Sequence, residues 1–286
     1  MQPDTLSVLL RSASFIALFQ AAGMVIFIAM FGRPLRSSLN KIRHLAQVSA
    51  IAAIALLLGH YAVEAARMAD DMKGMTDTSL QMMVMHSTAS VVLAFRILGL
   101  SVIAFALRRQ DDAGIVFSII GAVLVCASFI LTGHTVASPL RWALAPLLMF
   151  HVMIVGFWFG ALVPLYLVSR QESPIITGQV TEAFTRIAGW LVPAILAAGI
   201  MLGYFLVRHL DEFRLAYGIS LIAKVAGFAT LMGFAALNKW RLGPRLASGD
   251  HRAMRSFRRS LGFEYLLIAA VLSVTAVMTT FYSPEP

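Results

Sequence analysis

The chain has 286 residues, of which 59% are hydrophobic and only 13% charged, and its mean hydropathy is +0.81. Soluble domains carry about 45–50% apolar and about 25% charged residues, so a compact soluble fold, a disordered chain and a collagen-like fibre are excluded. The single cysteine, Cys126, excludes a disulfide scaffold, a zinc finger and a ferredoxin-type cluster. The composition predicts an all-α, polytopic membrane protein.

Eight stretches are long and apolar enough to cross a bilayer, which takes about 20 residues. They lack the alternation of barrel strands, so they predict eight transmembrane helices in a bundle. No linker or repeat divides the chain, and we treat residues 1–286 as a single integral membrane domain. The predicted spans are Ser12–Phe31, Leu45–Ala66, His86–Leu107, Ala113–Gly133, Trp142–Val168, Ile187–Val207, Tyr217–Leu237 and Leu261–Phe281.

The net charge of +9 is explained by the distribution of Lys and Arg over the loops. With the N-terminus outside, fifteen of them fall in inner loops and five in outer loops. The positive-inside rule then predicts that both termini are periplasmic. The basic balance therefore indicates topology and not a nucleic-acid partner, although the inner segment 239–259 is suited to contact anionic membrane lipid.

Five of the seven histidines fall toward the predicted outer side. His151 lies nine residues into its span, about 13 Å deep by helical rise. Ionisable groups at such depth are costly and usually face the bundle interior with a role. A histidine that only hydrogen-bonds a neighbouring helix is an equally compatible interpretation. The five are His60, His86, His134, His151 and His209.

Methionine is concentrated in one predicted outer loop. Six of the fifteen methionines lie between Met68 and Met85, where an even distribution would place about one. Thioethers are soft ligands that select Cu(I), and imidazole suits copper in either oxidation state. The run ends in His86, while His60 and Glu64 at i, i+4 offer two more donors on the preceding helix. The alternative is an amphipathic surface helix with methionine as flexible filler. The candidate thioether ligands are Met72, Met75, Met82 and Met85.

Three further charges lie in or beside apolar spans: Arg96, Lys224 and Glu264. Snorkelling to the interface explains Glu264 near a span end, but is a poorer explanation for Arg96. The depths of Lys224 and Glu264 differ too much for us to expect an ion pair between them. We treat these three residues and Glu64 as polar groups that support a candidate site.

The second half of the chain carries six short motifs in a fixed order, and these are similar to the copper-resistance protein D family of bacterial inner-membrane proteins. The resemblance covers about residues 130–286, and the first half resembles the family mainly in topology. Phe159-Gly160-Ala161 departs from the Gly-Gly pair more usual in the family, which affects close helix packing. The motifs are Gly133–Thr135, His151–Leu162, Glu182–Arg186, Tyr217–Lys224, Ala236–Lys239 and Arg259–Glu264.

The resemblance implies a copper role in the bacterial inner membrane, beside a small periplasmic partner of the copper-resistance protein C type. It makes Lys224 and Glu264 family-pattern positions, and His134 and His151 the residues most closely tied to the metal. The Met-rich loop is outside the recognised motifs, so a metal role there rests on the residues alone.

The leading hypothesis is a copper permease that imports copper, preferably Cu(I), from the periplasmic side for uptake or tolerance. The sequence has no phosphate-binding loop and no hydrolase motif, so we expect neither ATP-driven transport within the chain nor an enzyme. Two alternatives remain. One is a b-type membrane cytochrome, with haem held by pairs drawn from His60, His86, His134 and His151. The other is a non-transporting copper sensor or assembly scaffold.

Overall fold

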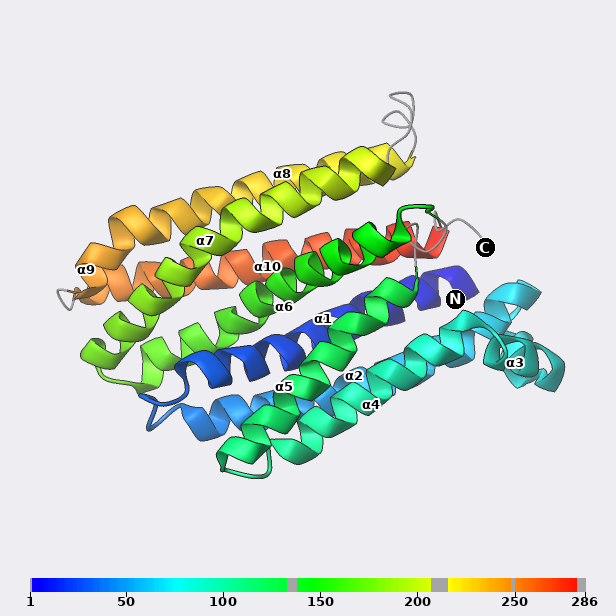
Figure 1. The fold of residues 1–286 in the computed structure, drawn as a ribbon, viewed down its shortest axis with the longest axis horizontal. Helices are drawn as coiled ribbons and strands as arrows, with labels where there is room; N and C mark the ends of the chain where they lie inside the picture. Colours follow the sequence, from blue (N-terminus) through cyan, green and yellow to red (C-terminus); the bar gives the residue numbers. More distant parts are fainter. Residues whose placement is uncertain (1, 133–137, 207–215, 248–249, 282–286) are drawn as a thin grey trace.

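The structure is a computed structural model that describes residues 2–132, 138–206, 216–247 and 250–281. The described chain folds into helices joined by short connections, with no strand among these residues (Figure 1). In chain order the elements are α1 (Pro3–Phe31), α2 (Leu39–Ala69), the 3-10 helix η1 (Met72–Thr76), α3 (Thr78–Met85), α4 (Thr88–Ala106), α5 (Asp112–Ala127), the 3-10 helix η2 (Ser128–Leu131), α6 (Arg141–Gln171), α7 (Pro174–Leu206), α8 (Ala216–Leu237), the π-helical turn η4 (Asn238–Leu242), α9 (Gly243–Ala247) and α10 (His251–Phe281).

Eight helices in the described part of the chain are long and apolar enough to cross a membrane, which confirms the predicted all-α polytopic fold. Helices α1, α7 and α10 begin well before the predicted spans that they contain. Hydropathy marks only the part of a helix that lies in lipid. The helix itself starts where the backbone allows, and α1 and α7 both start at a proline, whose fixed φ suits the first helical position.

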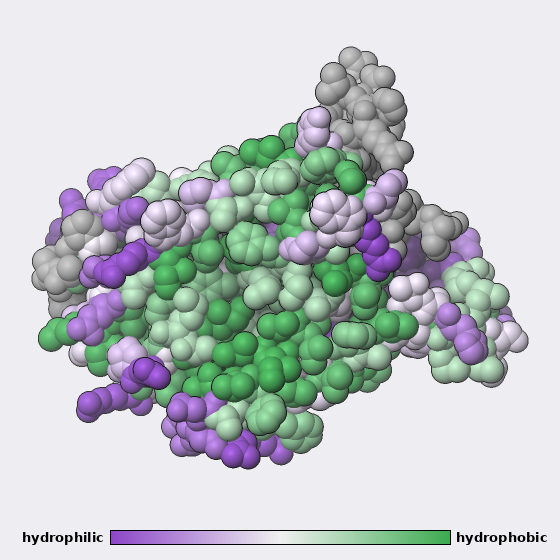
Figure 2. Space-filling view, viewed as in Figure 1, coloured by the Kyte–Doolittle hydropathy of each residue, from purple (hydrophilic) through white to green (hydrophobic). Residues whose placement is uncertain are grey.

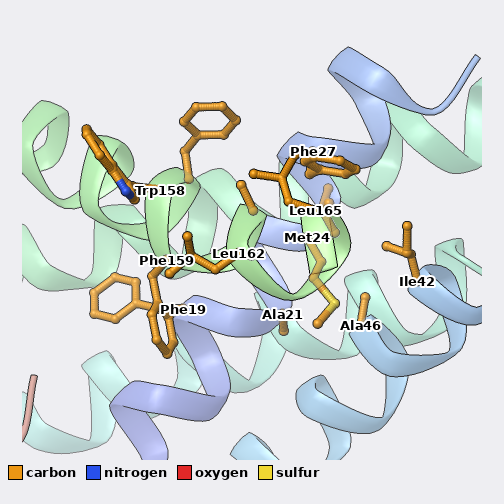
Figure 3. Close-up of a cluster of buried hydrophobic side chains, with 14 of the residues drawn as sticks. Phe19, Ala21, Met24, Phe27, Ile42, Ala46, Trp158, Phe159, Leu162 and Leu165 are labelled. Carbon is orange, nitrogen blue, oxygen red and sulfur yellow. The ribbon is translucent and has the colours of Figure 1, made fainter. Parts of the chain in front are cut away.

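Helices α1 and α6 form the centre of the bundle. Figure 1 shows α2, α4 and α5 on one side of this pair and α7, α8 and α10 on the other. The most buried membrane windows are those of α1 and α6, at 72% and 78%. Figure 3 shows how their side chains interlock, with Phe27 and Met24 of α1 beside Leu165 and Leu162 of α6. Residues from both halves of the chain thus share one core.

Two glycines allow α1 and α6 to approach each other closely. A methyl group on Gly23 would overlap the carbonyl oxygen of Gly156 and the Cα of Gly160, and one on Gly160 would overlap the backbone of Gly23. Membrane helices gain little from hydrophobic burial against each other, so close packing at small residues contributes much of their association. Gly160, part of the motif that departs from the usual family pattern, is therefore one of the residues that hold the central pair together.

We expect Gly160→Ala to lower the free energy of unfolding by about 1–3 kcal/mol, because the added methyl must push two backbones apart. Thermal unfolding in detergent, followed by circular dichroism, measures the loss. Gly233→Ala is the matched control, since a Cβ at Gly233 meets no described atom within 4 Å. Equal melting temperatures for the two variants would contradict close packing at Gly160.

A carboxylate joins two connections at one end of the bundle. Oε1 of Glu172, between α6 and α7, accepts hydrogen bonds from the backbone N–H groups of Arg36, Ser37 and Ser38 at 3.1, 2.9 and 2.8 Å. The hydroxyl of Ser38 donates a fourth at 2.7 Å. These donors precede α2, where unpaired N–H groups favour a negative charge. Burial by itself would raise the pKa of Glu172, but the four hydrogen bonds outweigh it and leave that pKa below its ordinary value.

The lowered pKa of Glu172 makes this contact sensitive to acid. A carboxylate whose pKa is lower in the folded state contributes stability above its unfolded pKa, about 4.3, and loses it as the pH falls through the folded pKa. We expect the wild type to exceed Glu172→Gln in unfolding free energy by about 1 kcal/mol at neutral pH. The difference should disappear as the pH falls through the folded pKa. Denaturant titrations of both proteins at several pH values measure it, and a pH-independent difference would contradict the assignment.

The two ends of the bundle differ in chemistry. One end, here called the α3 end, carries the start of α1, the end of α10 and helix α3 (Figure 1). The other, the α9 end, carries α9 and the connections richest in Lys and Arg. Figure 2 shows a hydrophobic surface over the middle and hydrophilic residues toward the ends. The positive-inside rule assigns the α9 end to the cytoplasm, and this orientation stays a prediction.

Candidate functional site

His60 of α2 lies in a polar cluster at the α3 end. Its Nε2 lies 3.0 Å from Nε of Arg11, 3.2 Å from Oγ of Ser7 and 3.1 Å from Oε1 of Glu64. Arginine always donates at Nε, so Nε2 of His60 is the acceptor in that pair. The lone pair that would bind a metal at Nε2 is therefore already used by Arg11.

Glu64 is shared between two arginines. Arg11 contacts its Oε1 at 3.4 Å and Arg67 contacts its Oε2 at 3.0 Å, while Arg67 also pairs with Asp4 at 2.8 Å. Arg11 and Arg67 donate further hydrogen bonds to the backbone carbonyls of residues 279 and 280 at the end of α10. The cluster thus ties α1, α2 and α10 together, and its arginines repel a metal cation at His60.

Arg96 of α4 is held inside the same half of the bundle. Its Nε donates to Oγ of Ser128 at 3.0 Å, and its guanidinium lies 4.5 Å from the ring centroid of Phe129 and 5.7 Å from that of Phe15. Cation–π contacts of this kind stabilise a charge away from water. Arg96 and Arg11 are also near enough for their charges to repel. Snorkelling therefore does not explain Arg96, which packs inward.

His151 lies within the membrane-spanning part of α6, on the side that faces α7 and α8. Its ring lies within hydrogen-bonding reach of the backbone of Ile195 in α7 and alongside Gly199, and Lys224 of α8 is near enough for its charge to act on the ring. Nδ1 of His151 is buried and has no hydrogen-bond partner among the described residues. A buried polar atom without a partner is costly, and a ring nitrogen in this state is available to a ligand.

The Met-rich segment forms two short helical pieces. Asp70 adopts a left-handed conformation with φ 51° and ends α2, and Asp77 caps α3 through Ser79 and Leu80. The segment is therefore two helical pieces and not one continuous helix, and the alternative that its methionines are apolar filler stays a prediction. Met72 and Met75 share the 3-10 helix η1, where residues i and i+3 eclipse. Met82 and Met85 share one face of α3.

The thioethers of this segment face outward. Met72, Met82 and Met85 are 36%, 50% and 52% exposed, and His86, which follows α3, is exposed as well. Gln81 fixes the segment to α2, because its Nε2 donates to the carbonyls of Ala62 and Met75. Soft ligands are thus presented to solvent at the α3 end by an anchored segment.

Glu264 of α10 is only 3% exposed and contacts Asn238 of the turn η4, which leads into α9. Its Oε1 accepts hydrogen bonds from the side-chain amide of Asn238 at 2.5 Å and from the Ser260 hydroxyl at 3.3 Å. Asn238 begins the π-helical turn η4, a distortion that is frequent at functional sites. Among the described residues no Lys or Arg forms an ion pair with Glu264. It does not pair with Lys224, in agreement with the expected difference in depth.

The structure brings only some of the predicted site residues together. His60 and Glu64 are in contact, and the charge of Lys224 acts on the ring of His151, but His60 and His151 face different helices. His134 and His209 lie outside the described residues. Within the described ranges no group of three or more His, Cys, Asp or Glu residues is arranged to hold a metal ion. The predicted ligands therefore form separate groups along the bundle.

Sequence reasoning missed the partners that determine these surroundings. Arg11 and Arg67 were not among the predicted site residues, yet they occupy His60 and Glu64. The sequence did contain a signal: an arginine directly before the first predicted span needs a carboxylate at the same depth, and Glu64 supplies it. Asn238 had no such signal, because its contact with Glu264 depends on the π-helical turn.

Comparison with known proteins covers both halves of the chain. Residues 1–142 match the family described as copper resistance protein D-like, N-terminal domain, and residues 178–278 match copper resistance protein D. The first half thus resembles the family in sequence as well as in topology.

Two curated proteins are similar to the chain. Copper resistance protein D of Pseudomonas syringae pv. tomato is 29% identical over 310 residues, covering 99% of this chain and 98% of that protein. Copper transport protein CutJ of Bacillus subtilis (strain 168) is 27% identical over 142 residues, covering 48% of this chain and 25% of that protein. No solved structure matches. Two family matches that cover most of the chain and a relative aligned from end to end lead to one conclusion: the chain belongs to the copper resistance protein D family.

Proposed function

We propose that this protein is a copper permease of the bacterial inner membrane, which takes copper from the periplasmic side. The names of its relatives, a copper resistance protein and a copper transport protein, support copper as the cargo. A periplasmic copper-binding protein of the copper-resistance protein C type is the partner that would deliver the ion. Copper is the substrate here, and the chain supplies the ligands along its route.

The observation that carries the proposal is the unpartnered Nδ1 of His151 inside a membrane span. Imidazole nitrogen binds copper in either oxidation state. The charge of Lys224 acts on this ring and opposes a cation bound there. Conduction requires binding strong enough for entry and weak enough for release, so a single histidine within the field of a lysine suits passage better than storage.

The thioethers of Met72, Met75, Met82 and Met85 supply the entry step; Met72, Met82 and Met85 are exposed and Met75 is partly buried. Thioethers select Cu(I) over the harder cations that are abundant outside the cell. They lie at the α3 end, which the charge distribution assigns to the periplasm. We therefore place collection of Cu(I) at the Met-rich segment and its transfer through the membrane at His151.

Uptake of radioactive copper into vesicles carrying the full chain tests the proposal. Right-side-out and inside-out vesicles are compared with vesicles that lack the protein, in the presence of a reductant. We expect protein-dependent accumulation from the α3 side. Copper binding without accumulation would replace the permease with a sensor or scaffold. A Soret absorbance band in the purified protein would support the cytochrome instead.

A further inference from the structure

An apolar groove runs between α6 and α10 at the α9 end. It has a volume of about 490 Å³, and its lining includes Leu162, Val163, Tyr166, Gly262, Phe263 and Leu266. A Cβ built at Gly262 meets no described atom within 4 Å, so the groove is open along this glycine. Because these residues lie on membrane-spanning helices, an apolar chain from the bilayer matches the groove.

A second, basic hollow of about 460 Å³ lies against the same tyrosine. Lys41 of α2 and Arg170 of α6 line it together with Tyr166, Leu167 and Gln171. Tyr166 belongs to both linings, and Arg259 of α10 lies on the groove side. Basic side chains from three helices therefore line two hollows that share Tyr166: Lys41 and Arg170 line the basic hollow, and Arg259 lines the groove.

These three cations are not neutralised within the described part of the chain. No carboxylate there forms an ion pair with Lys41, Arg170 or Arg259. The guanidinium of Arg170 donates to the Tyr166 hydroxyl at 3.3 Å, which leaves its charge unbalanced. Glu172 is near in sequence, but its Oε1 is engaged by residues 36–38. The α3 end differs, because Arg11 and Arg67 are paired there with Glu64 and Asp4.

We propose that this junction is a binding site for one anionic phospholipid. Its phosphate lies among Lys41, Arg170 and Arg259, and one acyl chain lies in the groove beside Gly262. Basic pockets between membrane helices bind anionic headgroups in this way, and guanidinium groups match phosphate geometry well. A soluble anion would satisfy the cations but leave the groove unfilled, whereas a zwitterionic lipid would fill the groove without balancing the charge.

Spin-labelled phosphatidylglycerol tests the site, with spin-labelled phosphatidylcholine as the comparison. Electron paramagnetic resonance of the full chain in lipid nanodiscs measures the fraction of lipid with restricted motion. We expect a larger fraction of phosphatidylglycerol than of phosphatidylcholine to show restricted motion. Each basic side chain near an anionic headgroup contributes about fivefold in affinity. The combined variant Lys41→Gln, Arg170→Gln, Arg259→Gln should therefore bind it on the order of 100-fold more weakly.

Matched variants separate a site from diffuse attraction. Arg33→Gln, Arg108→Gln, Arg255→Gln removes the same charge from the α9 end outside the groove and should preserve the selectivity. Gly262→Phe fills the groove and should reduce binding, whereas Gly233→Phe on α8 should not. Equal losses in the two triple variants, no effect of Gly262→Phe, or full displacement of the lipid by inorganic phosphate would each overturn the proposal.

Discussion

Replacing His151 with alanine is expected to lower copper uptake into vesicles at least tenfold. Loss of a residue that only supports a metal ligand lowers metal affinity or activity about 10–100-fold. Alanine at position 151 removes the ligand itself. The buried Nδ1 has no partner among the described residues, so the substitution breaks no hydrogen bond at that atom. We therefore expect the melting temperature and the protein level to change little. Copper uptake and thermal unfolding, measured on the same preparations, test whether uptake falls while stability is kept.

His151→Gln separates ligation from packing, because the amide keeps a polar group of similar size while removing the imidazole. It should resemble the alanine variant in uptake. His44→Gln is the matched control, since His44 is exposed at the opposite end of the bundle. Wild-type uptake by His151→Gln would make His151 an ordinary core residue, and the permease would lose its ligand within the membrane.

The number and type of the spanning helices were predictable because apolar length alone decides which segments enter a bilayer. The positions where helices begin were not, since they depend on local backbone chemistry. Proline starts α1 and α7, and the left-handed Asp70 ends α2. The Met-rich segment shows the consequence, because its methionine spacing gives no sign that Asp70 and Asp77 divide it into two helical pieces.

The surroundings of the candidate ligands were less predictable than their depth. His60 and Glu64 were expected as a metal-binding pair because they are one helical turn apart. Arg11, 49 residues away from His60, occupies both of them, and that contact depends on how α1 and α2 are rotated against each other. No periodicity in a single sequence encodes such a rotation. Copper binding at His60 would require Arg11 to move, so His60 is a weaker candidate ligand than His151.

The last prediction concerns the four methionines Met72, Met75, Met82 and Met85. We expect their joint replacement by leucine to weaken Cu(I) binding to the purified protein at least tenfold, because leucine keeps size and apolarity but has no sulfur donor. Met72, Met82 and Met85 are exposed, so little core packing depends on them. Titration against a competing Cu(I) chelator measures the affinity.

Four methionines in the membrane spans provide the control. Replacement of Met30, Met149, Met201 and Met232 by leucine removes as much sulfur from the chain but leaves the α3 end intact. Cu(I) affinity should then remain at the wild-type value, and both variants should melt like the wild type.

The uptake assay adds a further distinction, since a collecting site raises the local supply of copper. The loop variant should therefore lose uptake mainly at low external copper and regain it at high copper, whereas the His151 variants stay impaired throughout. Unchanged Cu(I) affinity in the loop variant would reduce these thioethers to apolar filler at the surface.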